Sequence, residues 1–383
     1  MRRVQHNRVY LDYASTTPVH PEILKAYKGL LDVWFVNSES LYQEGVQLHQ
    51  LMEKSRTQTA SLLNVRPNEI IFTSGASEAS SMAIKGVAFR HLEKKGHLIT
   101  TQVEHSSVTN CFKQLEELGF EVTWLSVDKR GCISMDELKK SVRHDTLLVS
   151  IMMVNNEVGA INPINEIKAY LKNHSHALLH VDCVQALGKI PVDLKDIDMA
   201  SFSAHKIHGL KGSGVLFCRQ HIDLMPLVCG GQQEFGRRGG TENALVNLMF
   251  AKTLRLALEG QKNGYEHAKM LNEYCVEQLS KMPEIELNSS SEGLPHILNF
   301  SCSTMLSEVL MNALNTRGFC VSAQSTCHSK SKAPSFVLKA MGYSDQRALS
   351  SIRLSFSYET TLKDVESFIH TLKECTQKYG TRL

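Results

Sequence analysis

Between residues 69 and 218, short apolar runs alternate with amphipathic stretches, and this alternation leaves few folds open to the chain. The amphipathic stretches at 77–95, 107–118 and 164–172 have the spacing of helices. Nearly continuous apolar runs are typical of strands buried on both faces, and alternating strands and helices favour a mainly parallel sheet with helices on both sides. The predicted strands are 69–73, 97–101, 120–127, 146–154, 177–182, 198–203 and 214–218.

The pattern changes after a long helical region at 242–282. Short strands at 296–302, 319–322 and 351–356 then mix with helices at 307–317 and 362–379. We therefore expect an α/β protein with a large domain at 15–258 and a smaller α+β domain formed by 1–14 and 259–383.

The composition excludes several classes of protein. Lys and Arg number 42 against 39 Asp and Glu, so no charge excess indicates a nucleic-acid or membrane partner. No apolar run approaches the ~20 residues of a membrane helix, and the basic N-terminus lacks the apolar stretch of a secretory signal. The ten cysteines form no C-x-x-C pair or metal-ligand cluster, so we expect no metal site and a cytoplasmic location.

Polar residues follow five of the predicted strands. Ligands of open α/β sheets bind beyond the carboxyl ends of the strands, so these residues indicate one pocket. They are Ser74–Ser77, Glu104–His105, Asn155–Glu157, Asp182 and His205–Lys206.

The turn Ser74-Gly75-Ala76-Ser77 links a strand to a helix, and free backbone N–H groups at such a helix start favour a phosphate. A plain helix cap by Ser74 or Ser77 is the alternative. The G-x-x-x-x-G-K-[ST] and G-x-G-x-x-G patterns are absent, so a nucleotide is not indicated.

Three further residues have competing interpretations. Asp182 could cap the next turn, or it could hold a proton on a ligand's ring nitrogen, with Gln185 within reach of the same ligand. Lys206 could be a solvated surface group, or an amine primed to form an imine by its cationic neighbours. His105 could be a hydrogen-bonded histidine at a helix start, or a ring that stacks on a cofactor and passes protons. Together they fit pyridoxal phosphate.

The motifs resemble the cysteine desulfurases, the NifS/IscS-like class V group of fold-type-I pyridoxal-phosphate enzymes. The resemblance runs from Tyr10–Pro18 to Arg353–Phe356. Between them lie F-T-S-G-A-S-E (72–78), E-H-S-S-V (104–108), V-N-N-E-V-G (154–159), V-D-C-V-Q (181–185), S-A-H-K-I-H-G (203–209), R-G-G-T (238–241) and P-S-F-V-L-K-A-M-G (334–342).

The resemblance implies a role for each matched residue. Lys206 carries pyridoxal phosphate, His105 stacks on it, Asp182 pairs with its ring nitrogen, and Gln185 and Asn155 approach its ring oxygen. The implied phosphate ligands are Ala76, Ser77, Ser203 and His205, with Thr241 reaching the other subunit of a homodimer. Arg353, for which a surface salt bridge is the alternative, binds the substrate carboxylate, and Asn155 and Asn37 complete the substrate site.

Cys327 corresponds to the family's persulfide-forming cysteine. It lies in the polar segment 323–333, for which we expect a mobile loop that can visit the substrate and then an acceptor. Its neighbours His328, Lys330 and Lys332 favour the thiolate, although one of ten cysteines could be exposed by chance. The chain departs from the family at Gln324–Thr326, in place of Gly-Ser-Ala, at Val36–Tyr42, which lacks a Gly and a His, and at Tyr13–Pro18.

The predicted activity is conversion of L-cysteine to alanine, with sulfur passing through Cys327 to an acceptor protein. Iron–sulfur assembly, tRNA thiolation and a thiamine pathway are possible destinations. A selenocysteine lyase or another class V enzyme is one alternative. A degenerate paralogue that acts as a scaffold or binds a sulfur carrier is another.

Overall fold

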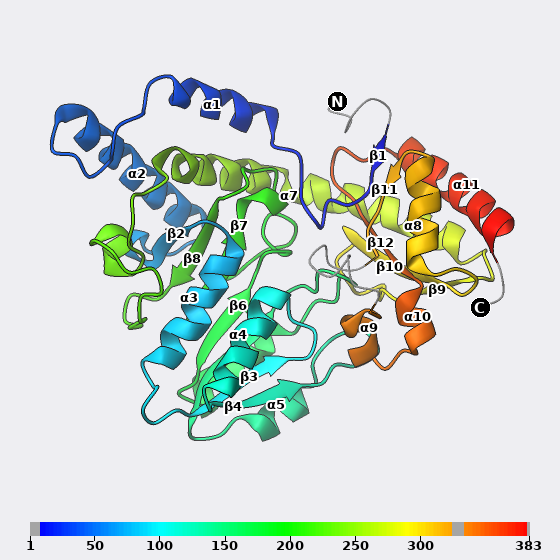
Figure 1. Ribbon diagram of the computed structural model, residues 1–383, viewed down its shortest axis with the longest axis horizontal. Coiled ribbons are helices and arrows are strands. Elements are labelled where there is room, and N and C mark those ends of the chain that lie inside the picture. Colours follow the sequence, from blue (N-terminus) through cyan, green and yellow to red (C-terminus); the bar gives the residue numbers. More distant parts are fainter. Residues whose placement is uncertain (1–7, 324–332, 381–383) are drawn as a thin grey trace.

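The computed structural model describes residues 8–323 and 333–380. A seven-stranded sheet forms its centre, with strand order β2-β8-β7-β6-β5-β3-β4 (Figure 1). The strands are β2 (Ile70–Thr73), β3 (His97–Thr101), β4 (Glu121–Leu125), β5 (Thr146–Met152), β6 (Leu178–Asp182), β7 (Met199–Ser203) and β8 (Gly214–Cys218). The seven predicted strands and the mainly parallel sheet are confirmed.

Only β8 runs against its neighbours in this sheet, since it pairs antiparallel with both β2 and β7. Residues 204–213, which join β7 to β8, contain a short 3-10 turn and no crossover helix. A parallel return needs a longer crossover, so β8 comes back antiparallel. As a consequence β2 is parallel to β7, and the carboxyl ends of β2, β3, β5, β6 and β7 all meet at one edge.

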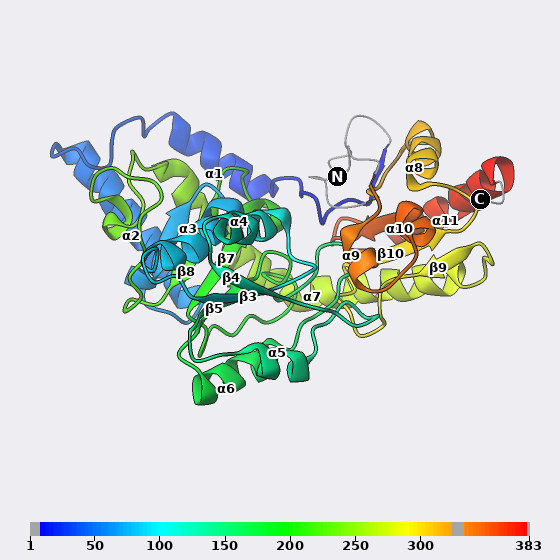
Figure 2. The same ribbon diagram turned by 60° about the horizontal axis from the view of Figure 1, so that its bottom comes forward.

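Helices cover both faces of the sheet (Figures 1 and 2). On one face, α3 (Ala76–Phe89) and α4 (Ser106–Glu117) pack against the strands through a core that includes Met82 and Phe112. On the other face lie α2 (Gln43–Leu62), α5 (Met135–Ser141), α6 (Ile164–His174) and the first half of α7 (Ala244–Leu279). Burial on both faces explains the continuous apolar runs of the strands.

A smaller α+β unit lies at the far end of α7 (Figure 1). Its antiparallel sheet contains β9 (Ile285–Leu287), β10 (Ile297–Cys302) and β12 (Ser351–Ser355). Helices α8 (Ser307–Thr316), α9 (Phe336–Ala340), α10 (Asp345–Leu349) and α11 (Leu362–Tyr379) accompany it. Leu11 and the second half of α7 share its apolar core, in keeping with the predicted two-domain division, which stays a prediction.

The N-terminal segment connects the two units. Its strand β1 (Val9–Tyr10) pairs with β11 (Phe319–Cys320), and the chain then crosses to α1 (Pro21–Leu31) beside the large sheet. On the way, the Thr17 N–H donates to the carbonyl of His205 at 2.9 Å. Within the described residues, no helix is both long and apolar enough to cross a lipid bilayer.

Candidate active site

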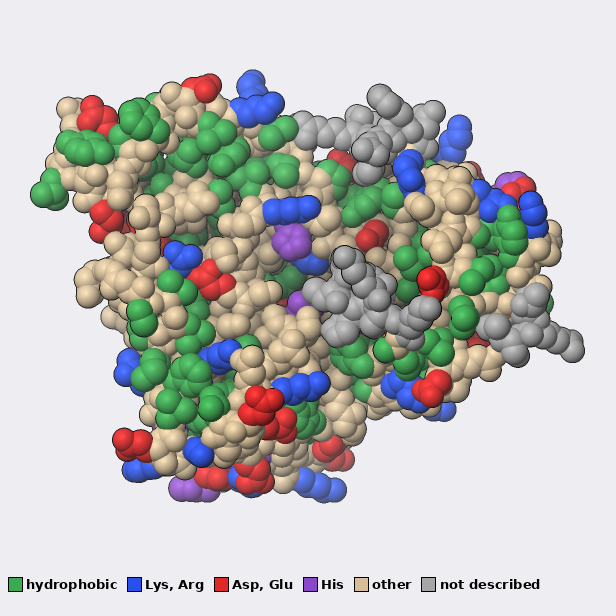
Figure 3. Space-filling model, in the orientation of Figure 1, with side chains coloured by type: hydrophobic (Ala, Val, Ile, Leu, Met, Phe, Trp, Pro, Cys, Tyr) green, Lys and Arg blue, Asp and Glu red, His purple; other side chains and the backbone are tan. Residues whose placement is uncertain are grey.

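A cavity of about 540 Å³ lies at the edge of the large sheet where the parallel strands end. Most of the predicted site residues line it together. These are Ala76, Ser77, His105, Asp182, Gln185, Ser203, His205, Lys206 and Arg353. The centre of the face in Figure 3 is hollowed and carries Lys, Arg and His side chains at its rim.

Lys206 lies at the end of the 3-10 turn Ala204–Lys206 that follows β7. Its Nζ donates to the carbonyls of Ala14 and Ser15, each at 2.7 Å. Both acceptors are backbone carbonyls of the N-terminal segment, and these two bonds hold the amine over the cavity. The side chain is partly buried, which does not fit the solvated-lysine alternative.

Asp182 ends β6 and is 7% exposed. Burial raises the pKa of its carboxyl to about 6, although the Val184 N–H at 3.0 Å and the charge of Lys206 act in the opposite direction. The bond from Val184 is the predicted cap. A cation placed beside Asp182 in the cavity would compensate its buried charge, so capping and ligand pairing are compatible.

Glu104 lies behind Asp182 and is completely buried. Its Oε1 accepts from Thr101 Oγ1 at 2.8 Å and from the Met152 N–H at 2.9 Å, whereas Oε2 has no hydrogen-bond partner among the described residues. Burial, with a smaller contribution from the charge of Asp182, raises the pKa of this carboxyl to about 8, although the hydrogen bonds from Met152 and Thr101 act in the opposite direction. At neutral pH Glu104 is therefore mainly protonated and adds no second negative charge to the cavity.

The turn between β2 and α3 leaves the helix N-terminus open to the cavity. Gly75 is the N-cap with φ +154°, and a Cβ there would meet only Ser203 Oγ, at 3.9 Å. The Ser74 N–H donates to Glu78 Oε2 at 2.8 Å, and Glu78 in turn accepts from Arg238 Nε at 2.8 Å. Glu78 thus bonds the turn ahead of the helix. Among the described residues no side chain caps the start of α3, so its cavity side stays accessible to an anion.

Two histidines flank this helix start. His105 is the N-cap of α4, and its Nδ1 lies 2.8 Å from Ser107 Oγ and 3.2 Å from the Ser107 backbone nitrogen. His205 Nδ1 shares a hydrogen bond of 3.1 Å with Thr16 Oγ1. Burial and the charge of Lys206 lower the pKa of His205 to about 4. His205 is therefore a neutral hydrogen-bonding group at physiological pH.

Arg353 comes from the small unit, in the middle of β12, and is 1% exposed. Its guanidinium donates to the Asn156 carbonyl at 2.7 Å, to Asp12 Oδ1 at 2.9 Å and to Ser15 Oγ at 2.7 Å, whereas Nε has no partner among the described residues. This burial excludes the surface salt bridge. Arg353 instead brings a cation from the small unit to the wall of the cavity.

Three predicted site residues lie outside the lining of this cavity. Asn155 is completely buried; its amide donates to the Val103 carbonyl, and its oxygen accepts from the N–H groups of Glu157 and Val158. Asn37 and Thr241 are exposed. Cys327 and its neighbours lie outside the described residues.

The sequence patterns missed the contribution of the N-terminal segment. Ala14, Ser15 and Thr16 line the cavity, and Asp12 pairs with Arg353. The only signal available was the match of Tyr10–Pro18 to the family motif, since nothing local in that segment predicts contact with residues some 190 positions away.

The cavity residues fit pyridoxal phosphate. Lys206 supplies an amine, Asp182 a buried carboxylate, and the Gly75 turn an accessible helix N-terminus beside Ser203 and His205. A pyridinium, an aldehyde and a phosphate are the groups that such a set can hold. Fold and cavity together therefore define an α/β enzyme of the pyridoxal-phosphate class.

Comparison with known proteins agrees with this class. The family model described as aminotransferase class-V matches residues 9–368. A NifS/IcsS protein homolog of Lactobacillus delbrueckii subsp. bulgaricus is 40% identical over 377 residues, which cover 97% of this chain and 98% of the relative. A cysteine desulfurase IscS of Dictyoglomus turgidum is 38% identical over 377 residues, or 97% and 95% of the two chains. A solved NifS-like protein has a TM-score of 0.92 at 35% identity and covers 97% of this chain and 100% of its own.

The chain belongs to the class-V aminotransferase family, within which it is similar along its length to the NifS/IscS-type cysteine desulfurases. The family resemblance and the fold class predicted from the sequence are thus confirmed. The roles of individual residues remain predictions. The geometry of the cavity adds which groups each of these residues contacts.

Proposed function

We propose that the protein is a pyridoxal-phosphate-dependent cysteine desulfurase, which converts L-cysteine to L-alanine and delivers the sulfur to an acceptor protein. The observation that carries this proposal is the meeting of Lys206, Asp182, His105 and Arg353 around one cavity. An amine, a buried carboxylate, an aromatic base and a substrate-binding cation are the groups that amino-acid chemistry on this cofactor requires.

In this proposal Lys206 holds the cofactor in the cavity, and Asp182 keeps a proton on its ring nitrogen. The turn at Ala76 and Ser77 holds the phosphate, together with Ser203 and His205. When bound, pyridoxal phosphate serves as an electron sink for the carbanion formed at the substrate Cα. His105 covers the ring face, since it stands at the cavity wall with its Nδ1 held by Ser107.

Arg353 orients the substrate by binding its carboxylate, and the Lys206 amine takes the Cα proton. The Cys327 thiolate then attacks the substrate Sγ, so that an S–S bond forms on Cys327 while the substrate Cβ–S bond breaks. The remaining three-carbon fragment takes a proton at Cβ, regains a proton at Cα from the Lys206 ammonium, and leaves as alanine. The outer sulfur of the Cys327 persulfide passes to the acceptor.

The test compares wild type with Cys327→Ser after reconstitution with pyridoxal phosphate. Exposure of wild type to L-cysteine should add one sulfur atom to the Cys327 peptide, measured by mass spectrometry, and should release alanine. Cys327→Ser should lose both. Alanine release by Cys327→Ser at the wild-type rate would contradict the nucleophile assignment. Faster turnover of selenocysteine or cysteine sulfinate than of cysteine would favour another class V activity, and failure to form an adduct at Lys206 would favour a scaffold.

We propose further that the protein acts as a homodimer, in which Asn37 and Thr241 of one subunit reach the active-site cavity of the other. The segments that carry these two exposed residues are joined, because Ser38 Oγ donates to Glu242 Oε2 at 2.9 Å. Beside them, Phe35 is 90% exposed and Leu41 is 96% exposed. Figure 3 shows apolar side chains gathered over this region at the upper left. Such a patch is unusual on a monomer and is typical of a protein interface.

Sedimentation of Phe35→Asp and Leu41→Asp tests the dimer, since either charge should shift the wild-type dimer toward monomer. A wild-type monomer would contradict the proposal. Candidate acceptors for iron–sulfur assembly, tRNA thiolation and a thiamine pathway can be compared in the same sulfur-transfer assay. A cytoplasmic location is part of this proposal and can be checked by cell fractionation.

A further inference from the structure

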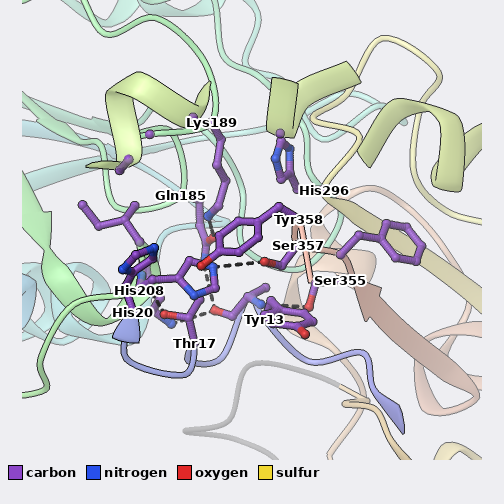
Figure 4. A pocket seen from close by; sticks show the side chains of 18 of the residues that line it. Tyr13, Thr17, His20, Gln185, Lys189, His208, His296, Ser355, Ser357 and Tyr358 are labelled. Atoms are coloured by element: carbon purple, nitrogen blue, oxygen red, sulfur yellow. Dashed lines mark hydrogen bonds between the residues drawn. The ribbon is translucent and has the colours of Figure 1, made fainter. Parts of the chain in front are cut away.

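A second cavity, of about 270 Å³, adjoins the candidate active site (Figure 4). The two cavities share Ala14, Gln185 and Lys206. The second one lies among the N-terminal segment, the middle of α7, the start of β10 and the residues that follow β12. The proposed desulfurase chemistry uses nothing in it beyond the shared residues.

The walls of the second cavity are mainly apolar. Ile23, Leu256, Ala257, Ile297 and Phe356 contribute aliphatic and aromatic surface. On α7, Gly260 and Gly264 also line it, and a Cβ at either position would meet nothing within 4 Å. These glycines keep the space along the helix open, and the volume is just below the ~300–1,000 Å³ of pockets for drug-sized ligands.

Lys189 is the charged side chain of this cavity that the proposed function does not use. Its Nζ donates to Gln185 Oε1 at 2.8 Å, and no carboxylate of a described residue lies within ion-pair distance. No Asp or Glu is among the described residues that line the cavity. Burial, together with the charges of Lys206 and Arg353, lowers the pKa of Lys189 to about 7. An ammonium in an apolar cavity is normally paired, but Lys189 has no counter-ion among the described residues.

Two histidines of the cavity, His208 and His296, do not supply further charge. Burial lowers the pKa of His208 to about 4 and that of His296 to about 3, so both are neutral at physiological pH. His208 is bonded to the Pro18 carbonyl and Ser357 Oγ. His296 is 7% exposed, and its Nδ1 has no hydrogen-bond partner among the described residues. Figure 4 shows Lys189, Gln185 and these rings around the same space.

We propose that the second cavity binds a small carboxylate with an apolar body, its carboxylate against Lys189 and its body along the glycine face of α7. The carboxylate supplies the counter-ion that Lys189 lacks. An amino acid such as the substrate fits less well, because its ammonium group would find no carboxylate among the described lining residues.

The test uses benzoate as the probe and benzamide as its uncharged counterpart, titrated into the cofactor-loaded protein by calorimetry and by ligand-observed NMR. Benzoate should bind at one site per chain, at least tenfold more tightly than benzamide. Lys189→Met should weaken benzoate by roughly tenfold to a hundredfold, the range of one charge-assisted hydrogen bond, and should change benzamide little.

Gly260→Leu should fill the cavity and abolish binding of both probes. Its matched control is Asn263→Leu, which places the same side chain at an exposed position of α7 outside the cavity lining and should bind benzoate like wild type. Thermal melting and the cofactor absorbance of each variant report whether it has folded.

Benzoate binding that survives Gly260→Leu unchanged would place the probe at Arg353 in the first cavity and overturn the proposal. Unchanged benzoate affinity in Lys189→Met would overturn it as well, and so would the absence of saturable binding up to 10 mM. These outcomes differ from failure of the desulfurase proposal, which is tested by Cys327→Ser.

Discussion

The two cavities beside Lys206 are built by different means. The first is lined by polar side chains that follow the strands of the large sheet, and its carboxylate Asp182 and cation Arg353 come from two different units. The second has apolar walls from α7 and one ammonium, Lys189, that has no carboxylate partner among the described residues. The contrast shows that strand ends concentrate several reactive groups at one edge of a sheet, whereas a long helix shared by the two units leaves space but brings few reactive side chains.

The largest expected effect is the difference in turnover between variants of the two lysines. Lys206→Ala should reduce turnover of L-cysteine by at least ~10³-fold and prevent the covalent cofactor adduct, since it removes both the anchoring amine and the base. Lys189→Met should keep the adduct and change turnover by less than about tenfold, because it acts only through Gln185. Reduced-adduct mass spectrometry and an alanine assay measure both. An equal loss of turnover in the two variants would show that the two cavities do not differ in function.

Glu104→Gln should remove a pH dependence of the free energy of unfolding that arises from the carboxyl behind Asp182. The folded-state pKa of Glu104 is about 8 and its ordinary value is 4.5, so between these values the folded protein holds a proton that the unfolded chain has released. Wild type therefore loses stability as the pH rises through this window, and the loss ends above pH 8. The advantage of the variant should grow by roughly 1 kcal/mol per pH unit.

Urea unfolding of wild type and Glu104→Gln from pH 5 to pH 8 measures this difference. Glu117→Gln, an exposed position on α4, is the matched control and should show no such trend. Parallel stability curves for wild type and Glu104→Gln would show that Glu104 is ionised in the folded protein.

Gly214→Ala should disturb the first cavity through its backbone. A Cβ at this position of β8 would meet Gly75 Cα at 2.5 Å and the Phe202 carbonyl at 2.8 Å. Neither is the flexible end of a side chain, so the turn before α3 must shift. We expect a loss of about 1–3 kcal/mol in the free energy of unfolding and weaker cofactor binding. A variant with wild-type stability and wild-type cofactor affinity would show that the turn accommodates the methyl group.

The corresponding change in the second cavity should be small and of opposite sign. Gly264→Ala places a methyl group where nothing lies within 4 Å, inside α7. Helix propensity alone should stabilise the protein by about 0.5–1 kcal/mol. Thermal unfolding measures the gain, and destabilisation would mean that the cavity wall along α7 is closed.

Much of the first cavity could be predicted because its residues follow strands that the sequence makes obvious. Asp182 and Lys206 come directly after buried apolar runs, and parallel topology brings such ends together. Asn155 follows the same rule, but its side chain turns inward to bond the Val103 carbonyl and the backbone of 157–158. The identity of a residue at a strand end does not say which backbone groups will compete for its side chain.

Elements without strong periodicity were harder to predict. Helices α1 and α2 and strand β9 were not predicted, although α2 packs closely against α7. The hydrophobic pattern of α2 is weak because Ser55 and Arg56 are among its buried residues. Arg56 is stabilised by Glu234, whose Oε2 lies 2.6 Å from its Nη1. A buried ion pair between residues so far apart in the chain leaves no local signal.

By itself, the sequence determined the α/β class, the positions of the buried strands and the set of polar groups at their ends, since burial and strand periodicity are local properties that each segment carries. Only the tertiary structure decided that Ala14 and Ser15 receive the Lys206 amine, that Asn155 turns away from the cavity, and that α7 leaves open space beside Lys189. These features arise from contacts between distant segments, and the free energy of such contacts depends on three-dimensional packing that no stretch of sequence encodes alone.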